Sequence, residues 1–202
     1  PVIKWAGGKG FLVDTVKDMQ PKGYKRYYEP FAGGAAVLLG LQPTAATLND
    51  INPELTNVYI QIKSNPAAVI EELTELDNRH QTAANPGDFY YAVRTRFNLC
   101  MGTNTPAQAA RFIYLNKHCF NGLYRVNSSG DFNVPFNGRA SGNSFTASNI
   151  NEVANYLRNV TITTADFGQS LPNIEKEDFV FIDSPYVPTT ANSFTGYTMT
   201  GF

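Results

Sequence analysis

The 202-residue chain is 43% hydrophobic and contains no apolar run of about 18 residues, so we expect a compact unit that crosses no membrane. Its net charge of −1 argues against a uniformly basic nucleic-acid binder. Two cysteines and two histidines, Cys100 and Cys119 with His80 and His118, are too few and too scattered for a disulfide framework or a protein-built metal site. We therefore expect free thiols in a cytoplasmic protein.

The first part of the chain alternates short strands and helices. An aromatic strand over 26–31 runs into the turn Ala32-Gly33-Gly34, and a small-residue helix over 35–41 follows. A second strand over 45–51 precedes a helix over 54–63. The order strand, glycine turn, helix, strand predicts the opening of a doubly wound α/β sheet.

The middle of the chain has a different pattern, which then returns to α/β. Helical spacing of apolar residues extends over 66–80, 88–99 and 106–119, and a loop-rich stretch dense in Asn, Gly and Ser covers 121–149. Strands are predicted again at 160–163 and 179–182. We interpret this as one α/β domain, formed by residues 1–64 and 151–202, with a helical and loop insertion at residues 65–150.

The near-neutral net charge conceals an uneven distribution. Residues 1–28 carry six Lys or Arg against two acids, and residues 89–151 carry six against one. The stretches 29–88 and 152–202 hold eight and six acids, each against two bases. A protein that grips phosphates with part of its surface has such a pattern. So does a protein with uneven charge and no polyanionic partner, and composition does not choose between them.

The segment Glu29-Pro30-Phe31-Ala32-Gly33-Gly34 has the features of a ligand-binding turn. Glycines after a strand let the backbone approach a ligand, and a helix N-terminus behind them adds partial positive charge. Asp50 ends the next strand, where a carboxylate can accept ribose hydroxyls of a nucleoside cofactor. The alternative is a tight turn with a capping acid. No Lys-Ser or Lys-Thr follows the glycines, which excludes a P-loop.

The segment Asp183-Ser184-Pro185-Tyr186 ends an apolar strand, where ligands of open α/β sheets gather. A carboxylate and a backbone carbonyl that accept both N–H groups of an aromatic amine free its lone pair to attack a sulfonium methyl group. Asp183 and the Ser184 carbonyl can fill these roles. Tyr186 offers a face on which a base can stack. The alternative is an ordinary turn, which Asp, Ser and Pro all favour.

Two further segments have the composition of a nucleic-acid contact. Lys4-Trp5-Ala6-Gly7-Gly8-Lys9 holds two lysines that can reach phosphates or bases, or is simply a flexible basic segment. From Asn116 to Phe136, aromatic residues alternate with amides and Arg125 around turn signals at Asn121-Gly122 and Ser129-Gly130. Such a loop suits wedging into a base stack and reading a guanine edge. The alternative is an irregular loop whose aromatic rings pack inward.

Taken together and in this order, these segments resemble the Dam-type family of DNA adenine-N6 methyltransferases. The resemblance extends from Lys4 to Phe202, and the four blocks in family order make it specific. It implies a Rossmann-like class I methyltransferase sheet with S-adenosylmethionine as methyl donor. It also implies a flipped adenine in double-stranded DNA as acceptor, within a GATC site. No metal is implied.

The resemblance implies roles for individual residues. It implies donor contacts from the turn, from acids after strands and from the first basic block, namely Trp5, Lys9, Glu29, Phe31, Gly33, Asp50, Ile51, Asp166, Phe167 and Asp183. It implies DNA contacts from Lys4, Lys9, Phe120, Asn121, Leu123, Arg125 and Pro135. Among these, Lys4 and Arg125 match residues facing guanines, and Phe120 with Asn121 matches residues that fill the gap left by the adenine. The catalytic motif is Asp183, Ser184, Pro185 and Tyr186.

Two departures from the family pattern bear on activity. The family usually has Pro where this chain has Ser184. Ser184 still supplies the backbone carbonyl, but it makes the turn less rigid than Pro would. The chain has no initiator Met and ends soon after the catalytic motif, so we expect a piece of a longer protein whose remaining strands complete the sheet. The rival functions are cytosine-N4 methylation, a catalytically silent DNA-binding remnant and, more remotely, RNA methylation. A monomer is expected, with a cognate restriction endonuclease as a possible partner.

Overall fold

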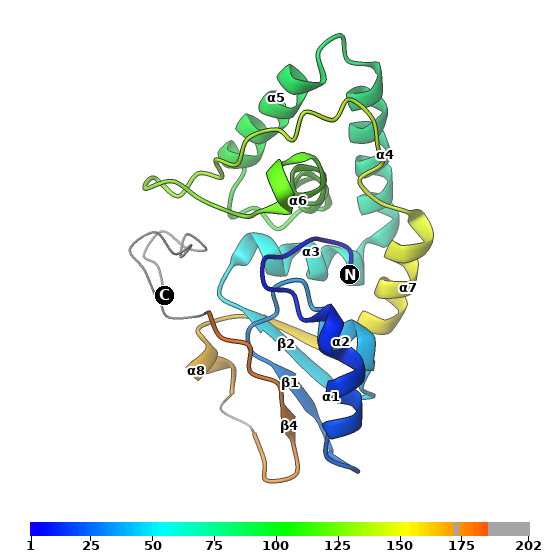
Figure 1. The fold of residues 1–202 in the computed structure, drawn as a ribbon, viewed down its shortest axis with the longest axis vertical. Coiled ribbons are helices and arrows are strands. Elements are labelled where there is room, and N and C mark those ends of the chain that lie inside the picture. Colours follow the sequence, from blue (N-terminus) through cyan, green and yellow to red (C-terminus); the bar gives the residue numbers. More distant parts are fainter. Residues whose placement is uncertain (172–173, 186–202) are drawn as a thin grey trace.

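The computed structural model describes residues 1–171 and 174–185, and its centre is a parallel sheet (Figure 1). The strands are β1 (Tyr27–Glu29), β2 (Ala46–Asp50), β3 (Val160–Thr164) and β4 (Phe179–Val180). They are arranged in the order β3-β2-β1-β4, and every neighbouring pair is parallel. The predicted α/β class is confirmed, with strands somewhat shorter than the sequence pattern indicates.

Helices surround the sheet and form a second layer above it (Figure 1). The elements near the sheet are η1 (Gly10–Leu12), α1 (Val13–Met19), α2 (Ala36–Leu41), α3 (Pro53–Ser64), α7 (Ala147–Leu157) and α8 (Phe167–Ser170). The upper layer consists of α4 (Pro66–Thr82), α5 (Pro86–Leu99), α6 (Pro106–His118) and η2 (Phe120–Gly122). The long helices lie where the apolar spacing predicts them.

Three of the long helices begin with the same local chemistry. The side chains of Asn52, Asn85 and Thr105 accept hydrogen bonds from the first backbone N–H groups of α3, α5 and α6. A proline follows each cap at the first helical position, where its missing N–H costs nothing and its fixed φ suits the helix. The sequence therefore sets these helix starts locally.

The connections around β1 place a crevice at one edge of the sheet. Tyr27 of β1 pairs with Ala46 of β2 on one side and with Phe179 of β4 on the other. The chain leaves β1 toward β2, whereas β4 arrives from the far end of the sequence. In open parallel sheets, the carboxyl ends of two such strands diverge and form the usual ligand site. The segments after β1 and β4 face each other at this point.

One continuous core joins the sheet layer to the upper helices, and α3 lies between them. Leu55, Val58 and Ile62 of α3 are fully buried within the same cluster as Leu73 of α4 and Ile113 of α6. Burial of apolar side chains is the main stabilising contribution to folding. The insertion is therefore packed onto the sheet layer through α3.

Some features differ from the sequence-based predictions. Helices α1 and α8 were not predicted, and α7 begins at Ala147, inside the stretch assigned to loop. His80 and His118 do not stand alone, because α4 and α6 bring their rings to 4.2 Å between centroids. Within the described ranges no group of His, Cys, Asp and Glu is suited to hold a metal ion, and no helix there is long and apolar enough to span a bilayer.

Candidate active site at the carboxyl edge of the sheet

The turn after β1 is held in a conformation that glycine favours. Gly33 has a φ of +45°, and a Cβ there would lie 2.7 Å from Cδ1 of Trp5. The Tyr59 hydroxyl of α3 donates a 2.7 Å hydrogen bond to the Gly33 carbonyl. The indole of Trp5 thus lies directly against this turn, which brings the first basic block to the predicted donor site.

Asp50 at the end of β2 fixes the same turn from the next strand. Its Oδ2 accepts a 3.0 Å hydrogen bond from the Gly33 N–H, and its Oδ1 accepts one of 3.0 Å from the Asn52 N–H. Burial raises the pKa of this carboxyl above its usual range, while the backbone donors oppose that shift. Ile51, the next residue, is 55% exposed, so its side chain is open to a ligand.

Glu29 is buried beneath the turn. Its Oε2 accepts hydrogen bonds from the Tyr27 hydroxyl at 2.7 Å and from the Leu38 N–H of α2 at 3.0 Å. Desolvation raises the pKa of Glu29 to about 8, against the opposing effect of these two donors. The carboxyl ties β1 to the first turn of α2, so it supports the turn from behind.

The segment after β3 closes the edge of the sheet next to β2. Asp166 caps α8 by accepting a 2.9 Å hydrogen bond from the Gly168 N–H. The ring of Phe167 lies 5.4 Å from that of Phe31, measured between centroids, and is 44% exposed. Two aromatic rings from different strand ends therefore meet at this edge of the sheet.

The segment after β4 brings the predicted catalytic acid to the first basic block. The Lys9 ammonium lies 2.9 Å from each carboxylate oxygen of Asp183 and also donates to the Gly7 carbonyl at 2.6 Å. The paired side chains are 14% and 25% exposed. Ser184 and Pro185 follow directly, and Tyr186 lies outside the described residues. Residues 174 positions apart are thus joined at the crevice.

The loop after α6, residues 120–125, is held by the N-terminal segment and by an arm. Asn121 has a φ of +55° and the Phe120 side chain is 51% exposed, so this loop has a strained residue beside an exposed ring. The Phe120 N–H donates to the Pro135 carbonyl at 2.8 Å. A Cβ on Gly122 would lie 2.8 Å from the Lys4 side chain, so Lys4 packs flat on this loop.

The predicted arm over 130–136 is present as two isolated antiparallel bridges, Val126 with Phe132 and Cys119 with Phe136. Asn133 on this arm holds Arg125 through two hydrogen bonds. The Arg125 Nε–H donates to the Asn133 Oδ1 at 2.7 Å, and a terminal nitrogen of Arg125 donates to the Asn133 backbone carbonyl at 3.4 Å. Arg125 is therefore oriented before any ligand arrives, with exposed surroundings.

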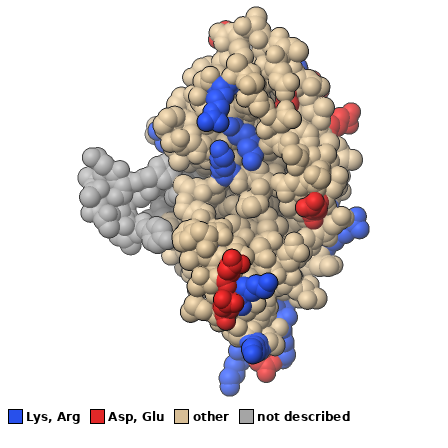
Figure 2. Space-filling model, turned by 45° about the vertical axis from the view of Figure 1, so that its right-hand side comes forward, with Lys and Arg blue, Asp and Glu red and all other residues tan. Residues whose placement is uncertain are grey.

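One group of basic side chains lies on the upper layer. Figure 2 shows Lys and Arg grouped at the centre of the upper half of one face, over the insertion, whereas toward the lower end further Lys and Arg are mixed with acids. Burial lowers the pKa of Lys117, and the nearby charge of Lys4 lowers it further. Lys4 and Lys117 therefore lie close together. Such a group attracts a polyanion.

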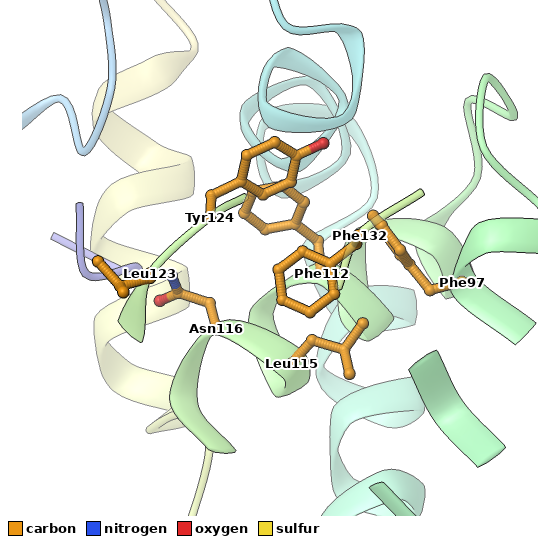
Figure 3. Close-up of a pocket in the computed structure, with 7 residues that line it drawn as sticks. All are labelled: Phe97, Phe112, Leu115, Asn116, Leu123, Tyr124 and Phe132. Atoms are coloured by element: carbon orange, nitrogen blue, oxygen red, sulfur yellow. The ribbon is translucent and has the colours of Figure 1, made fainter. Parts of the chain in front are cut away.

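The cavities do not by themselves mark the site. A small cavity of about 10 Å³ is buried in the insertion (Figure 3), lined by Phe97, Phe112, Leu115, Asn116, Leu123, Tyr124 and Phe132. It is too small for a nucleoside. A hollow of about 340 Å³ lies on the sheet beside α8 and is lined by Arg26, Tyr28, Thr47, Thr161, Thr163, Ala165, Gln169 and Ser170. None of the residues predicted to contact the donor lines this hollow, although Ala165, which does, precedes Asp166 in the chain.

The structure thus brings Trp5, Lys9, Gly33, Asp50 and Asp183 to one edge of the sheet. Of the DNA-contact candidates, Lys9 lies at this edge and Lys4 packs against the loop, which with the arm carries Phe120, Asn121, Leu123, Arg125 and Pro135. Sequence reasoning assigned no role to Tyr59, Asn116 or Asn133, whose side chains bond to the turn, the N-terminal segment and Arg125. Tyr59 and Asn116 give no signal for such roles, because each depends on a contact distant along the chain, and Asn133 gives none because its bond depends on how the arm folds back.

A parallel sheet of this order, with acids after three of its strands and a glycine turn after β1, defines a class I methyltransferase-like fold. The comparisons with known proteins agree and are more specific. The family model of the D12 class N6 adenine-specific DNA methyltransferases matches residues 5–202. The chain belongs to this family and is a site-specific, adenine-specific DNA methyltransferase.

Curated relatives match along the whole chain. It is 37% identical to the Type II methyltransferase M1.LlaDCHI of Lactococcus lactis, covering 100% of this chain and 71% of the relative. It is also 37% identical to the Type II methyltransferase M.MjaIII of Methanocaldococcus jannaschii, covering 100% and 74%. Identity to the DNA adenine methylase of Haemophilus influenzae is 34%, covering 98% and 68%. Membership of this adenine-specific DNA methyltransferase family decides against the cytosine-N4 and RNA alternatives.

Proposed function

We propose that this enzyme transfers a methyl group from S-adenosylmethionine to N6 of an adenine flipped out of duplex DNA, within GATC. The observation that carries the proposal is that the N-terminal segment joins two groups at one edge of the sheet: Lys9 pairs with Asp183, and Trp5 lies against the Gly33 turn that Asp50 holds. We propose that Asp50 serves the nucleoside donor and Asp183 the acceptor amine.

The residues at this edge suit the donor. Asp50 ends β2 and accepts backbone hydrogen bonds from Gly33 and Asn52, which leaves lone pairs on its carboxylate for ribose hydroxyls. The rings of Phe31 and Phe167 form walls for an adenine ring, and Asp166 lies beside them. The absence of a Cβ at Gly33 lets the Trp5 ring pack directly against the turn. When bound, S-adenosylmethionine supplies an electrophilic methyl group on its sulfonium.

The chain's own groups prepare the acceptor. Asp183 and the Ser184 carbonyl accept hydrogen bonds from the two N–H groups of the adenine N6, which leaves its lone pair free to attack the methyl group. The methyl–sulfur bond breaks as the bond to N6 forms, and Asp183 takes up the proton that N6 loses. Lys9 holds the Asp183 carboxylate in place from 2.9 Å and must share it with the incoming amine. A carboxylate retains this capacity because it has four lone-pair sites. Tyr186 is proposed to stack on the flipped base.

The loop and arm provide the contacts to DNA. Flipping costs a few kcal/mol, which insertion of Phe120 and Asn121 into the vacated position offsets. Arg125 and Lys4 are proposed to read guanine edges. Leu123 and Pro135 contact the thymine and its neighbour. The basic group of the insertion binds the phosphates.

The remaining assignments are proposals of the same kind. We propose that residues 1–64 and 151–202 form the methyltransferase domain and residues 65–150 the target-recognition insertion. We propose a monomeric enzyme that acts in the cytoplasm, where its DNA substrate lies. Two relatives are named Type II methyltransferases, which favours a cognate restriction endonuclease in the same system.

The test is methyl transfer with a defined duplex. The full-length enzyme is incubated with S-adenosylmethionine carrying a tritiated methyl group and a duplex with one GATC site, and the DNA is then digested to nucleosides. We expect tritium only in N6-methyl-2′-deoxyadenosine, and none with a duplex in which the site is changed to GTTC. Equal labelling of a duplex without GATC contradicts the proposed target. Absence of labelling contradicts the proposed donor.

A further inference from the structure

Asn116, near the end of α6, binds two separate segments through one amide group. Its Oδ1 accepts a 2.8 Å hydrogen bond from the Lys4 N–H, and its Nδ2 donates to the Lys4 carbonyl at 2.8 Å. The same Nδ2 donates to the Gly122 carbonyl at 3.1 Å. The side chain is 3% exposed, so water competes little for these bonds.

The two segments that Asn116 joins belong to opposite halves of the proposed site. Gly122 lies in the loop proposed to enter the base stack, and Lys4 packs on it because glycine has no Cβ. Lys4 precedes Trp5, which lies against the Gly33 turn. Figure 3 shows Asn116 projecting from α6 toward Leu123 on this loop. One amide therefore reaches both the DNA-facing loop and the segment that leads to the donor turn.

Aromatic stacking completes the connection. The Trp5 ring stacks on Tyr124 at 5.6 Å between centroids, and Tyr124 stacks on Phe112 of α6 at 5.4 Å. Burial of the Tyr124 hydroxyl raises its pKa to about 12, and a hydrogen bond with Asn52, beside Asp50, acts against that shift. The stack can slide along its faces, whereas the amide bonds fix position along the Lys4 backbone.

We propose that Asn116 is a positioning residue that sets the DNA-reading loop and the donor-binding turn relative to each other through the Lys4–Trp5 segment. This inference rests on the proposed function, since it presumes a donor at the Gly33 turn. Asn116 itself contacts neither DNA nor donor. Loss of its bonds therefore weakens the binding of both ligands while leaving the reacting groups intact.

The test compares two substitutions of equal chemistry in the full-length enzyme. Asn116→Asp keeps the size of the side chain, removes its donors and places a carboxylate oxygen against two carbonyls. Asn98→Asp is the matched control, because Asn98 of α5 makes the same two-sided pair with the Phe132 backbone, at 3.0 and 3.1 Å. The Asn98–Phe132 pair lies within the insertion and involves no residue of the N-terminal segment.

Three quantities are measured: tryptophan emission, with the Trp5→Phe variant as reference, the Kd of S-adenosylhomocysteine, and the KM for the GATC duplex. Asn116→Asp is expected to shift the Trp5 emission and to raise both the Kd and the KM about tenfold, as the loss of buried hydrogen bonds predicts. At saturating ligands its single-turnover rate is expected within about threefold of the wild type. Asn98→Asp is expected to leave the Trp5 emission and the Kd unchanged.

Hydrogen exchange of the unsubstituted enzyme provides a second measurement that needs no variant to fold. The Lys4 N–H belongs to no helix or strand, yet the bond to Asn116 predicts slow exchange. The inference is overturned if the Lys4 N–H exchanges as fast as an unprotected loop amide. It is also overturned if Asn116→Asp leaves the Trp5 emission and the Kd of S-adenosylhomocysteine unchanged, or if both variants change them equally. Failure of the wild type to bind S-adenosylhomocysteine or to methylate contradicts the proposed function instead.

Discussion

At the scale of single residues, the pairing of Lys9 with Asp183 determines what the crevice can do. Both carboxylate oxygens lie 2.9 Å from the ammonium, and both side chains remain partly exposed. The acid is therefore oriented yet accessible to an incoming amine. Lys9 comes from the start of the chain and Asp183 from β4, so the pair also fixes the N-terminal segment over the crevice.

Replacement of Asp183 tests its role as acceptor. Asp183→Ala removes the carboxylate that receives an N6 proton, and we expect the single-turnover rate of methyl transfer to fall on the order of a thousandfold. Binding of the GATC duplex should change little, because phosphate contacts dominate it. Asp14→Ala, an exposed acid of α1, is the control and should retain the wild-type rate. A rate within tenfold of wild type for Asp183→Ala argues against the assignment.

Glu29 predicts a pH dependence of stability. Its pKa is about 8 in the folded state against 4.5 for the free group, so between these values the unfolded chain has released a proton that the native state keeps. The contribution of Glu29 to stability therefore falls as pH rises from about 4.5 to 8 and is constant below that window. Glu29→Gln is neutral in both states.

Urea unfolding at several pH values between 5 and 8 measures this effect. The stability of Glu29→Gln relative to wild type should increase with pH across the window. Using the difference between the two proteins cancels groups such as His80, whose pKa is lowered, mainly by burial and next by His118, and whose contribution has the opposite sign. A difference that does not vary with pH means that Glu29 is already ionised in the folded enzyme.

Gly33 predicts a steric effect on donor binding. In Gly33→Ala the new Cβ would lie 2.7 Å from the Trp5 ring, and the alanine would have to keep a φ of +45°. The indole or the turn must therefore move. We expect the Kd of S-adenosylhomocysteine to rise about tenfold or more, since a turn that contacts a ligand tolerates little displacement.

Gly23→Ala is the matched control for Gly33→Ala. Gly23 also has a positive φ, of +76°, but a Cβ there meets nothing within 4 Å. It carries the same kind of backbone strain, which costs about 1 kcal/mol, without the steric clash. Isothermal titration should therefore show donor affinity preserved in Gly23→Ala. Equal loss in both variants attributes the effect to strain alone.

At the scale of elements, the arm that carries Asn133 orients Arg125. Asn133→Ala removes the 2.7 Å bond to the guanidinium, so Arg125 samples more rotamers before it meets a base. We expect discrimination between GATC and a duplex with one guanine replaced to fall by about 1 kcal/mol in kcat/KM, roughly fivefold. Asn143→Ala removes an exposed bond to Gln81 in the same insertion and should leave discrimination unchanged. The reverse order of effects refutes this role of the arm.

Elements with a clear local signal could be predicted from the sequence. A capping residue followed by proline predicts the starts of α3, α5 and α6, at Asn52-Pro53, Asn85-Pro86 and Thr105-Pro106. Helix α1 has no buried residue and no capping side chain, so it shows neither an apolar stripe nor a start signal. Helix α8 spans four residues, too few for any period to appear.

The candidate site divides in the same way. Asp50 and Asp183 were predicted because acids after strands of a parallel sheet share one edge. The bond from Asn116 to Lys4 spans 112 positions and ends on backbone atoms, which carry no residue identity. The closeness of His80 and His118 likewise depends on how α4 packs on α6. Side-chain pairs of this kind become visible only when the helices are placed.

At the scale of the whole molecule, the sheet layer and the insertion share polar as well as apolar contacts. Glu54 of α3 is buried and accepts hydrogen bonds from the Gly102 N–H and from Gln108 of α6. Asn57 of α3 donates to the Thr105 carbonyl. A buried carboxylate with these partners ties the two layers together, so their unfolding should be coupled.

Glu54→Ala tests this coupling. Loss of the carboxylate leaves Gly102 N–H and the Gln108 amide without that acceptor, which costs about 2 kcal/mol and lowers Tm by several degrees. Calorimetry should show one transition that contains both layers, shifted as a whole, because the two layers share a core. The exposed Glu71→Ala on α4 should leave Tm unchanged. Two transitions, only one of them shifted, indicate that the insertion folds independently.

The position of β4 has a consequence for the order in which the enzyme is assembled. Tyr27 finds its partner in β2 soon after synthesis, but its partner in β4 emerges from the ribosome about 150 residues later. The turn at Gly33 and the acid Asp50 can thus be in place while Asp183 is still absent. We expect the Gly33 turn and Asp50 to be assembled before Asp183 joins them, so reactivity is acquired only when β4 has docked.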